Sequence, residues 1–181
     1  MSEFAQYTAG PAGGAQVIKG GDRWTLILVR ELRHSPEKVW QALTDPMHVR
    51  EWAPFVTEGN LGTVGAAVTL TWVGTGKPTE VIVRRADAPK LLEFGDIRWE
   101  LEPLAGGTRL TLWHQIDHRF VSWGAAGWHI AFDVLDRFLS GTPLGRIAGA
   151  DAMKLGWQRL VAEYGKQFGI EAAKPKAPEE K

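Results

Sequence analysis

Between Gly62 and Asp117, apolar and polar residues alternate along the chain with a period of two. This period is typical of strands with one buried face, and Gly, Pro and Asp residues separate the runs as turns do. The pattern predicts strands at Ala67–Val73, Thr79–Ala86, Lys90–Phe94, Ile97–Glu102 and Thr108–Ile116, after an earlier strand at Trp24–Arg33. The short connections favour antiparallel pairing.

Helical patterns lie on both sides of this run. Ser35-Pro36 and Asp45-Pro46 each place a capping side chain before a proline, which predicts two short helices after the first strand. Near the C-terminal end, the pattern predicts a helix at 123–140 with Trp128, Phe132, Leu135 and Leu139 on one face, and another at Ala150–Phe168. The order of elements indicates an α+β fold in which helices gather on one face of an antiparallel sheet.

The two ends of the chain differ in composition from its centre. Residues 1–22 contain a Gly- and Ala-rich stretch with little to bury, and residues 171–181 are charged and contain two prolines. We therefore expect a flexible N-terminal tail at 1–22, one domain at 23–170 and a flexible C-terminal tail at 171–181.

Composition excludes several classes of function. The 181 residues include 21 basic and 21 acidic side chains and no cysteine. Without a basic stripe we expect no nucleic-acid partner, and without cysteine there is no disulfide, thiolate metal site or cysteine nucleophile. We expect no metal and no cofactor. The chain shows neither a secretory leader nor an apolar stretch that could span a membrane, so we expect a cytoplasmic protein without a membrane partner.

Several strings resemble a known superfamily. They are RELRHSPEKVWQALTDP at residues 30–46 with Trp52 six residues later, GTRLTLWH at 107–114, and Gly127-Trp128. These strings resemble the START-like or Bet v 1-like (SRPBCC) helix-grip superfamily, in the subgroup related to the activator of Hsp90 ATPase. The resemblance implies a curved antiparallel sheet wrapped around a long C-terminal helix, with an apolar cavity between them. The helix at Ala150–Phe168 is extra to that pattern.

The chain contains nine tryptophans, enough to fill a wide core or to line a cavity. Strand parity places His114 on the same face as Leu110 and Leu112, and this apolar face is the inner one. We expect a small apolar or aromatic ligand to contact Trp52, Trp72, Trp99, Leu112, His114, Trp128 and Phe132.

Two groups are weak candidates for catalysis. His114, directed inward, could anchor a ligand or act as a general base, but a histidine there could also hold the sheet by a hydrogen bond. His129 and Asp133 lie four residues apart on the predicted helix, a spacing that suits an acid–base pair and equally a solvated helix face.

The leading hypothesis is a ligand-binding protein rather than an enzyme. One alternative is a cyclase- or hydrolase-type enzyme that uses the same cavity. Another, which follows from the resemblance, is a chaperone-associated interaction protein. Trp113 is expected on the outer face of the sheet, which leaves a homodimer open.

Overall fold

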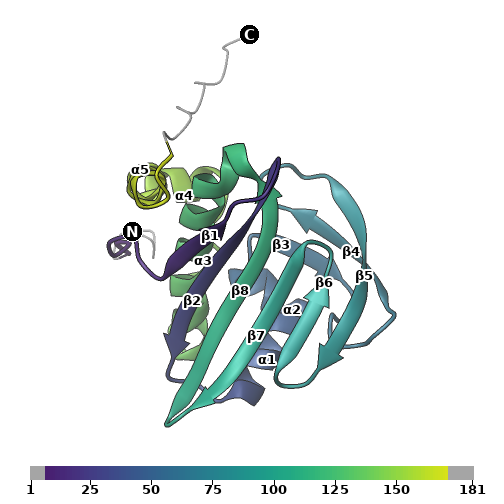
Figure 1. The fold of residues 1–181 in the computed structure, drawn as a ribbon. Coiled ribbons are helices and arrows are strands. Elements are labelled where there is room, and N and C mark those ends of the chain that lie inside the picture. Colours follow the sequence, from purple (N-terminus) through teal and green to yellow (C-terminus); the bar gives the residue numbers. More distant parts are fainter. Residues whose placement is uncertain (1–6, 171–181) are drawn as a thin grey trace.

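The alternating segments form an eight-stranded antiparallel sheet in the computed structural model, which describes residues 7–170 (Figure 1). The strand order is β1-β2-β8-β7-β6-β5-β4-β3, so every strand pairs with its chain neighbour except where β2 meets β8. The strands are β1 (Ala15–Ile18), β2 (Arg23–Leu32), β3 (Phe55–Glu58), β4 (Ala67–Trp72), β5 (Pro78–Asp87), β6 (Leu91–Phe94), β7 (Ile97–Leu104) and β8 (Gly107–Asp117). The predicted α+β class and antiparallel pairing are confirmed.

Two short helices follow β2, as the capping signals predicted. They are α1 (Pro36–Thr44) and α2 (Pro46–Trp52). The Ser35 side chain accepts a hydrogen bond from the Lys38 N–H, and the Asp45 side chain accepts one from the Met47 N–H. Each cap satisfies a backbone donor that the first helical turn leaves without an internal partner.

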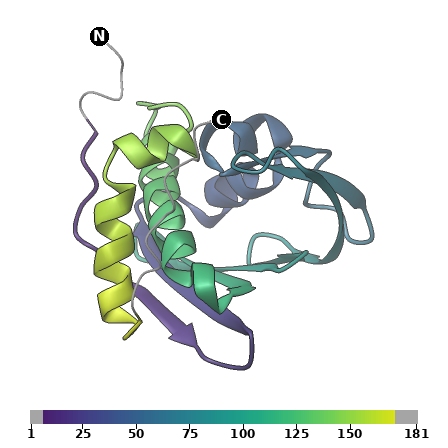
Figure 2. The same ribbon diagram turned by 90° about the horizontal axis from the view of Figure 1, so that it is seen from above.

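The long helix α3 (Val121–Leu139), preceded by the 3₁₀ turn η2 (His118–Phe120), packs against the sheet. Figure 2 shows α3 between the sheet and α5 (Trp157–Gln167), which packs on its other side. The helix predicted at 123–140 is therefore the one that the sheet grips. None of the helices in residues 7–170 has the length and apolar character needed to cross a membrane.

The predicted C-terminal helix is divided in the structure. A separate short helix, α4 (Ala150–Lys154), precedes α5, and Gly156 between them has a φ of +100°. Such a left-handed conformation ends helical hydrogen bonding and is readily adopted only by glycine. α4 buries Ala152 and α5 buries Leu160, Val161 and Tyr164, whereas Met153 of α4 is 46% exposed.

Two strands were not predicted, β1 and β3. Both have four residues, too few to show a clear alternation. The structure thus differs from the expected tail at 1–22: Ala15–Ile18 pair with β2, and Tyr7 hydrogen-bonds to Asp133. Residues 1–6 and 171–181, which the predicted tails include, lie outside the described residues.

The predicted inner face of the sheet is confirmed by burial. Leu110, Leu112 and His114 of β8 are buried, as are Trp99 and Leu101 of β7. Trp113 lies on the opposite side of β8 and is half-buried. The inner face of the sheet and α3 together enclose the core, which contains Leu92, Trp99, Leu112, Phe132 and Leu135.

A cavity between the sheet and helix α3

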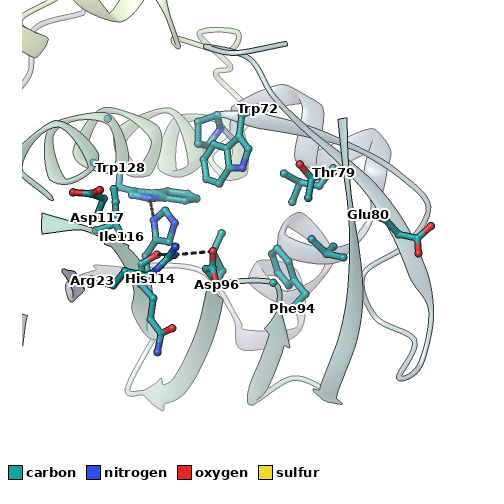
Figure 3. A pocket seen from close by; sticks show the side chains of 18 of the residues that line it. Arg23, Trp72, Thr79, Glu80, Phe94, Asp96, His114, Ile116, Asp117 and Trp128 are labelled. Carbon is teal, nitrogen blue, oxygen red and sulfur yellow. Dashed lines mark hydrogen bonds and ion pairs between the residues drawn. The ribbon is translucent and has the colours of Figure 1, made fainter. Parts of the chain in front are cut away.

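A cavity of about 650 Å³ opens between the sheet and α3. It lies between the N-terminal half of α3, the end of β8, the β6–β7 turn and the β4–β5 hairpin (Figure 3). Most of its walls are apolar, with Leu70, Trp72, Val81, Phe94, Ile97, Ile116 and Trp128 among them. A cavity of this size and character is typical of small-molecule sites.

Two glycines in α3 line this space, and their surroundings differ. Gly124 and Gly127 are three residues apart, so they share a face of the helix, and both line the cavity. A Cβ atom at Gly124 would lie 2.9 Å from Cδ1 of Ile116, so the helix approaches the sheet closely there. A Cβ atom at Gly127 would meet no other atom within 4 Å. Gly127 therefore borders empty space.

Three aromatic side chains form one corner of the cavity. The imidazole of His114 is parallel to the Trp72 ring, with an interplanar angle of 3° and ring centroids 5.7 Å apart. The Trp128 ring is nearly perpendicular to both, at 86° to His114 and 83° to Trp72. Figure 3 shows the three side chains meeting at one end of the cavity. A flat ligand could contact their faces and edges by offset or edge-to-face packing.

The hydrogen bond between Trp128 and His114 determines the protonation of the imidazole. An indole N–H can only donate, and Nε1 of Trp128 lies 3.1 Å from Nδ1 of His114, which must therefore accept. Burial lowers the pKa of His114 to about 4, so the ring is neutral near pH 7 and has its proton on Nε2. Within residues 7–170, Nε2 has no hydrogen-bond partner.

Charged side chains lie at the mouth of the cavity. Arg23 at the start of β2 donates to Asp96 in the β6–β7 turn at 2.9 Å and to the backbone oxygen of Gln115. From the other side, Arg84 of β5 donates to the backbone oxygen of Gly95 at 2.7 Å. Both arginines thus hold the β6–β7 turn, which forms part of the rim.

The predicted ligand-binding residues fall into two groups. Trp72, His114 and Trp128 line the cavity. Trp52, Trp99, Leu112 and Phe132 are fully buried in the adjoining core and do not line it. The Trp52 indole N–H donates to the backbone oxygen of Ala42 at 2.9 Å, and its ring packs edge-on against Trp99. These four side chains support the cavity wall from behind.

The predicted pair His129 and Asp133 lies on a different face of α3, away from the cavity. Asp133 accepts hydrogen bonds from Arg30 at 2.5 Å and from Tyr7 at 2.6 Å, and its carboxylate is 3.7 Å from Nε2 of His129. Nδ1 of His129 is 2.6 Å from the Tyr164 hydroxyl of α5, which also bonds to both backbone groups of Gly13. Burial lowers the pKa of His129 and raises that of Tyr164. The cluster joins α3, β2, α5 and the N-terminal segment.

Neither histidine belongs to a metal-ligand set. Among residues 7–170, no group of three or more His, Asp or Glu side chains is placed to hold a metal ion. The polar chemistry available in the cavity is therefore that of His114, together with the charged and hydroxyl groups at its rim.

Sequence reasoning named Gly127 only as part of the family resemblance and gave it no place in the site, and it missed the Arg23–Asp96 pair. The signal for Gly127 was available: a glycine in the interior of a strongly apolar helix, three residues after Gly124 and next to Trp128, costs helix stability and indicates a packing or functional need. Arg23 and Asp96 are 73 positions apart, and only the sheet topology brings them together.

Comparisons with known proteins agree with this architecture. The family model described as "Polyketide cyclase / dehydrase and lipid transport" matches residues 23–165. No curated protein matches the chain.

Several solved structures share the fold. CalU16 from Micromonospora echinospora is 21% identical, with a TM-score of 0.63 over 88% of this chain and 98% of its own. EF2215 from Enterococcus faecalis, a conserved protein of unknown function, is 15% identical, with a TM-score of 0.64 over 91% and 94%. DynU16, a protein in the dynemicin biosynthetic locus, is 23% identical, with a TM-score of 0.59 over 71% of this chain and 51% of its own.

The family model covers most of the chain, and the neighbours share its helix-grip architecture. The narrower resemblance to the activator of Hsp90 ATPase stays a prediction. The chain belongs to the polyketide cyclase/dehydrase and lipid transport family, within the SRPBCC helix-grip superfamily.

Proposed function

We propose that this protein binds a small, largely apolar or aromatic molecule in the cavity between the sheet and α3. One observation supports this most strongly: a neutral histidine, buried in an apolar cavity, keeps its Nε2–H without a partner among residues 7–170. Nε2 is not among the buried side-chain atoms of the described residues that lack a partner, so this N–H is accessible from the cavity. A ligand that supplies an acceptor can therefore pair with it.

The direction of this hydrogen bond defines the ligand. Because Nδ1 of His114 already accepts from Trp128, the imidazole can offer a ligand only its Nε2–H. The ligand should therefore carry an acceptor such as a carbonyl oxygen, attached to a flat apolar body that packs against Trp72 and Trp128. A ligand that offers only donors at this point would leave two N–H groups facing each other.

A pair of probes with one atomic difference tests this proposal. 2-Acetylnaphthalene has a carbonyl oxygen where 2-isopropenylnaphthalene has a CH₂ group, and the two have nearly the same shape. Binding is measured by quenching of tryptophan fluorescence and by calorimetry. We expect the ketone to bind the protein roughly five- to ten-fold more tightly, the effect of about 1 kcal/mol for one hydrogen bond.

The variant His114→Phe is the matched control, because it keeps an aromatic ring beside Trp72 and removes the donor. The substitution also removes the acceptor of the Trp128 N–H, so the comparison is made in the double variant His114→Phe/Trp128→Phe, where both donors are absent and the two probes should bind with equal affinity. If the ketone keeps its advantage in the double variant, His114 is not the anchor. If neither probe binds the wild-type protein at concentrations up to their solubility, the proposal of an aromatic ligand in this cavity is wrong.

Catalysis in the same cavity is the second candidate, supported by the family description, which includes cyclases and dehydrases. The geometry restricts what His114 could do. With Nδ1 occupied by Trp128, the neutral ring cannot accept a substrate proton without losing that bond, but its Nε2–H can stabilise negative charge developing on a substrate oxygen. Native mass spectrometry of protein purified from its own host distinguishes the two, because a carrier releases the compound unchanged after incubation and an enzyme converts it.

A further inference from the structure

A second, smaller chamber lies beside the main cavity. It has a volume of about 210 Å³ and is lined by Pro54, Gly127, Ile147, Ala148, Gly149, Ala152, Met153 and Trp157. Its walls come from the start of β3, from α3 and from the segment around α4, so the extra C-terminal elements build most of it.

The lining of the second chamber is apolar throughout. Its single polar side-chain atom is Nε1 of Trp157, which already donates to the backbone oxygen of Trp123 at 3.3 Å. No side chain of the chamber is charged, and none has a polar atom left to pair with a ligand group. By its chemistry the chamber fits a hydrocarbon substituent.

The two chambers share two walls, Pro54 and Gly127. At Gly127 a Cβ atom would meet no other atom within 4 Å, so the helix surface there is open space rather than a packed contact. Glycine in a helix interior destabilises the helix relative to alanine. No close contact requires glycine at this point, in contrast to Gly124, whose Cβ would be 2.9 Å from Ile116. The bare backbone at Gly127 thus adds open space at a residue that lines both chambers.

We infer that the ligand of this protein has two parts, a head with a hydrogen-bond acceptor at His114 and an apolar arm that passes between Pro54 and Gly127 into the second chamber. This inference rests on the proposed function, since it extends the same ligand. The α4 segment then limits the length of the arm that the protein can bind. The aromatic corner of Trp72, His114 and Trp128 binds the head.

A homologous series of probes tests the inference. 2-Acetylnaphthalene and its 6-ethyl, 6-butyl and 6-hexyl derivatives share one head and differ in the arm. If the arm enters the second chamber, the dissociation constant should fall about four-fold for each methylene that becomes buried, until the chamber is full. Calorimetry with wild-type protein gives this dependence on chain length.

Ala152→Leu is the blocking variant, because Ala152 is buried in α4 and lines only the second chamber. It should abolish the gain from the longer arms and leave the affinity for 2-acetylnaphthalene within two-fold of wild type. Lys154→Leu is the matched control, since it places the same side chain at an exposed position of the same helix and should preserve the gain. If Ala152→Leu fails to fold by circular dichroism, Ala148→Leu fills the same chamber from a half-buried position.

The outcomes separate the two proposals. If 2-acetylnaphthalene binds and the chain-length gain disappears in the blocking variant alone, the inference is supported. If the parent compound binds but longer arms bring no gain, or the same gain in both variants, the inference is wrong while the proposed function stands. If no member of the series binds wild-type protein, both proposals are overturned.

Discussion

A buried histidine lies on each of two sides of helix α3: His114 of β8 beside the cavity and His129 of α3 on the other side. The two differ in the partners that surround them. On the cavity side, His114 accepts from Trp128 and its second nitrogen has no partner among residues 7–170. On the other side, His129 is 2.6 Å from the Tyr164 hydroxyl and 3.7 Å from the Asp133 carboxylate. Both imidazoles have a pKa lowered by burial.

Burial of a histidine therefore does not by itself identify a binding site. The cluster around His129 (the closed cluster) is enclosed by other parts of the chain: Arg30 and Tyr7 donate to Asp133, and Tyr164 bonds to Nδ1 of His129 and to Gly13, while Nε2 of His129 lies 3.7 Å from the Asp133 carboxylate. Such a cluster holds elements together. In the corner around His114, the Nε2–H faces the cavity without a partner among residues 7–170. A ligand can accept a hydrogen bond from such a donor.

The largest expected effect is on the pH dependence of the free energy of unfolding. The unfolded chain protonates His114 near its ordinary pKa of 6.5, whereas the folded protein protonates it only near pH 4. Between these values the unfolded state binds more protons, so the free energy of unfolding should fall as the pH is lowered from 6.5 to 4, by about 3 kcal/mol from this group. Urea denaturation measured across this range gives the curve.

The variant His114→Phe separates this effect from that of His129, whose lowered pKa acts in the same direction. The variant's stability should depend less steeply on pH below 6.5, and the difference between the two curves is the contribution of His114. Parallel curves would show that His114 titrates alike in the folded and unfolded states, contrary to its buried, neutral position.

The next test breaks the closed cluster. Asp133→Ala removes the acceptor of both Arg30 and Tyr7, leaving a partly buried guanidinium and a hydroxyl without partners. We expect the free energy of unfolding to fall by about 2 kcal/mol. Asp136→Ala on the same helix is the control, because that side chain is 49% exposed and should cost less than about 1 kcal/mol. If both variants lose the same free energy of unfolding in urea denaturation, the cluster does not stabilise the fold more than an exposed side chain does.

Much of the fold could be predicted from the sequence because its signals are local. The alternation of Leu110, Leu112 and His114 determined the inner face of β8, and Ser35 with Pro36 located the start of α1. The four-residue strands β1 and β3 were missed because their pairing partners, not their own sequence, hold them in the sheet. Gly156 divided a predicted helix because its left-handed conformation cannot be read from apolar periodicity.

The candidate site was only partly predictable, because it depends on which inward side chains border empty space. Parity placed Trp72, Trp99 and Leu112 together on the inner face, yet Trp72 lines the cavity and the other two are packed into the core. The cause is tertiary: α3 packs closely against one part of the sheet and diverges from another. Similarly, four-residue spacing joined His129 to Asp133, but nothing local indicated that Tyr7, Arg30 and Tyr164 would enclose them.

A smaller effect is expected at the two helical glycines, which compare open with packed helix surface directly. Gly127→Ala should raise the free energy of unfolding by about 1 kcal/mol, because alanine favours the helix and its Cβ meets no other atom within 4 Å. Gly124→Ala should gain less, since its Cβ would lie 2.9 Å from Ile116 Cδ1 and force that side chain to move. Equal gains in thermal unfolding would contradict the open space assigned to Gly127.

The smallest effect concerns two arginine–aspartate pairs, one on each side of the comparison. In the closed cluster, the Arg30 and Asp133 side chains are 28% and 22% exposed, whereas at the cavity mouth Arg23 and Asp96 are 56% and 57% exposed. Solvent screens the exposed pair, so a double-mutant cycle of Arg23→Ala and Asp96→Ala should give a coupling energy below about 0.5 kcal/mol. The same cycle on Arg30 and Asp133 should give a clearly larger value, because water competes less for those groups. A strong coupling at the mouth would mean that the Arg23–Asp96 pair holds the β6–β7 turn as firmly as the closed cluster is held. A ligand that enters beside the turn would then have to break a stable contact. A weak coupling leaves the turn free to move when a ligand enters the cavity.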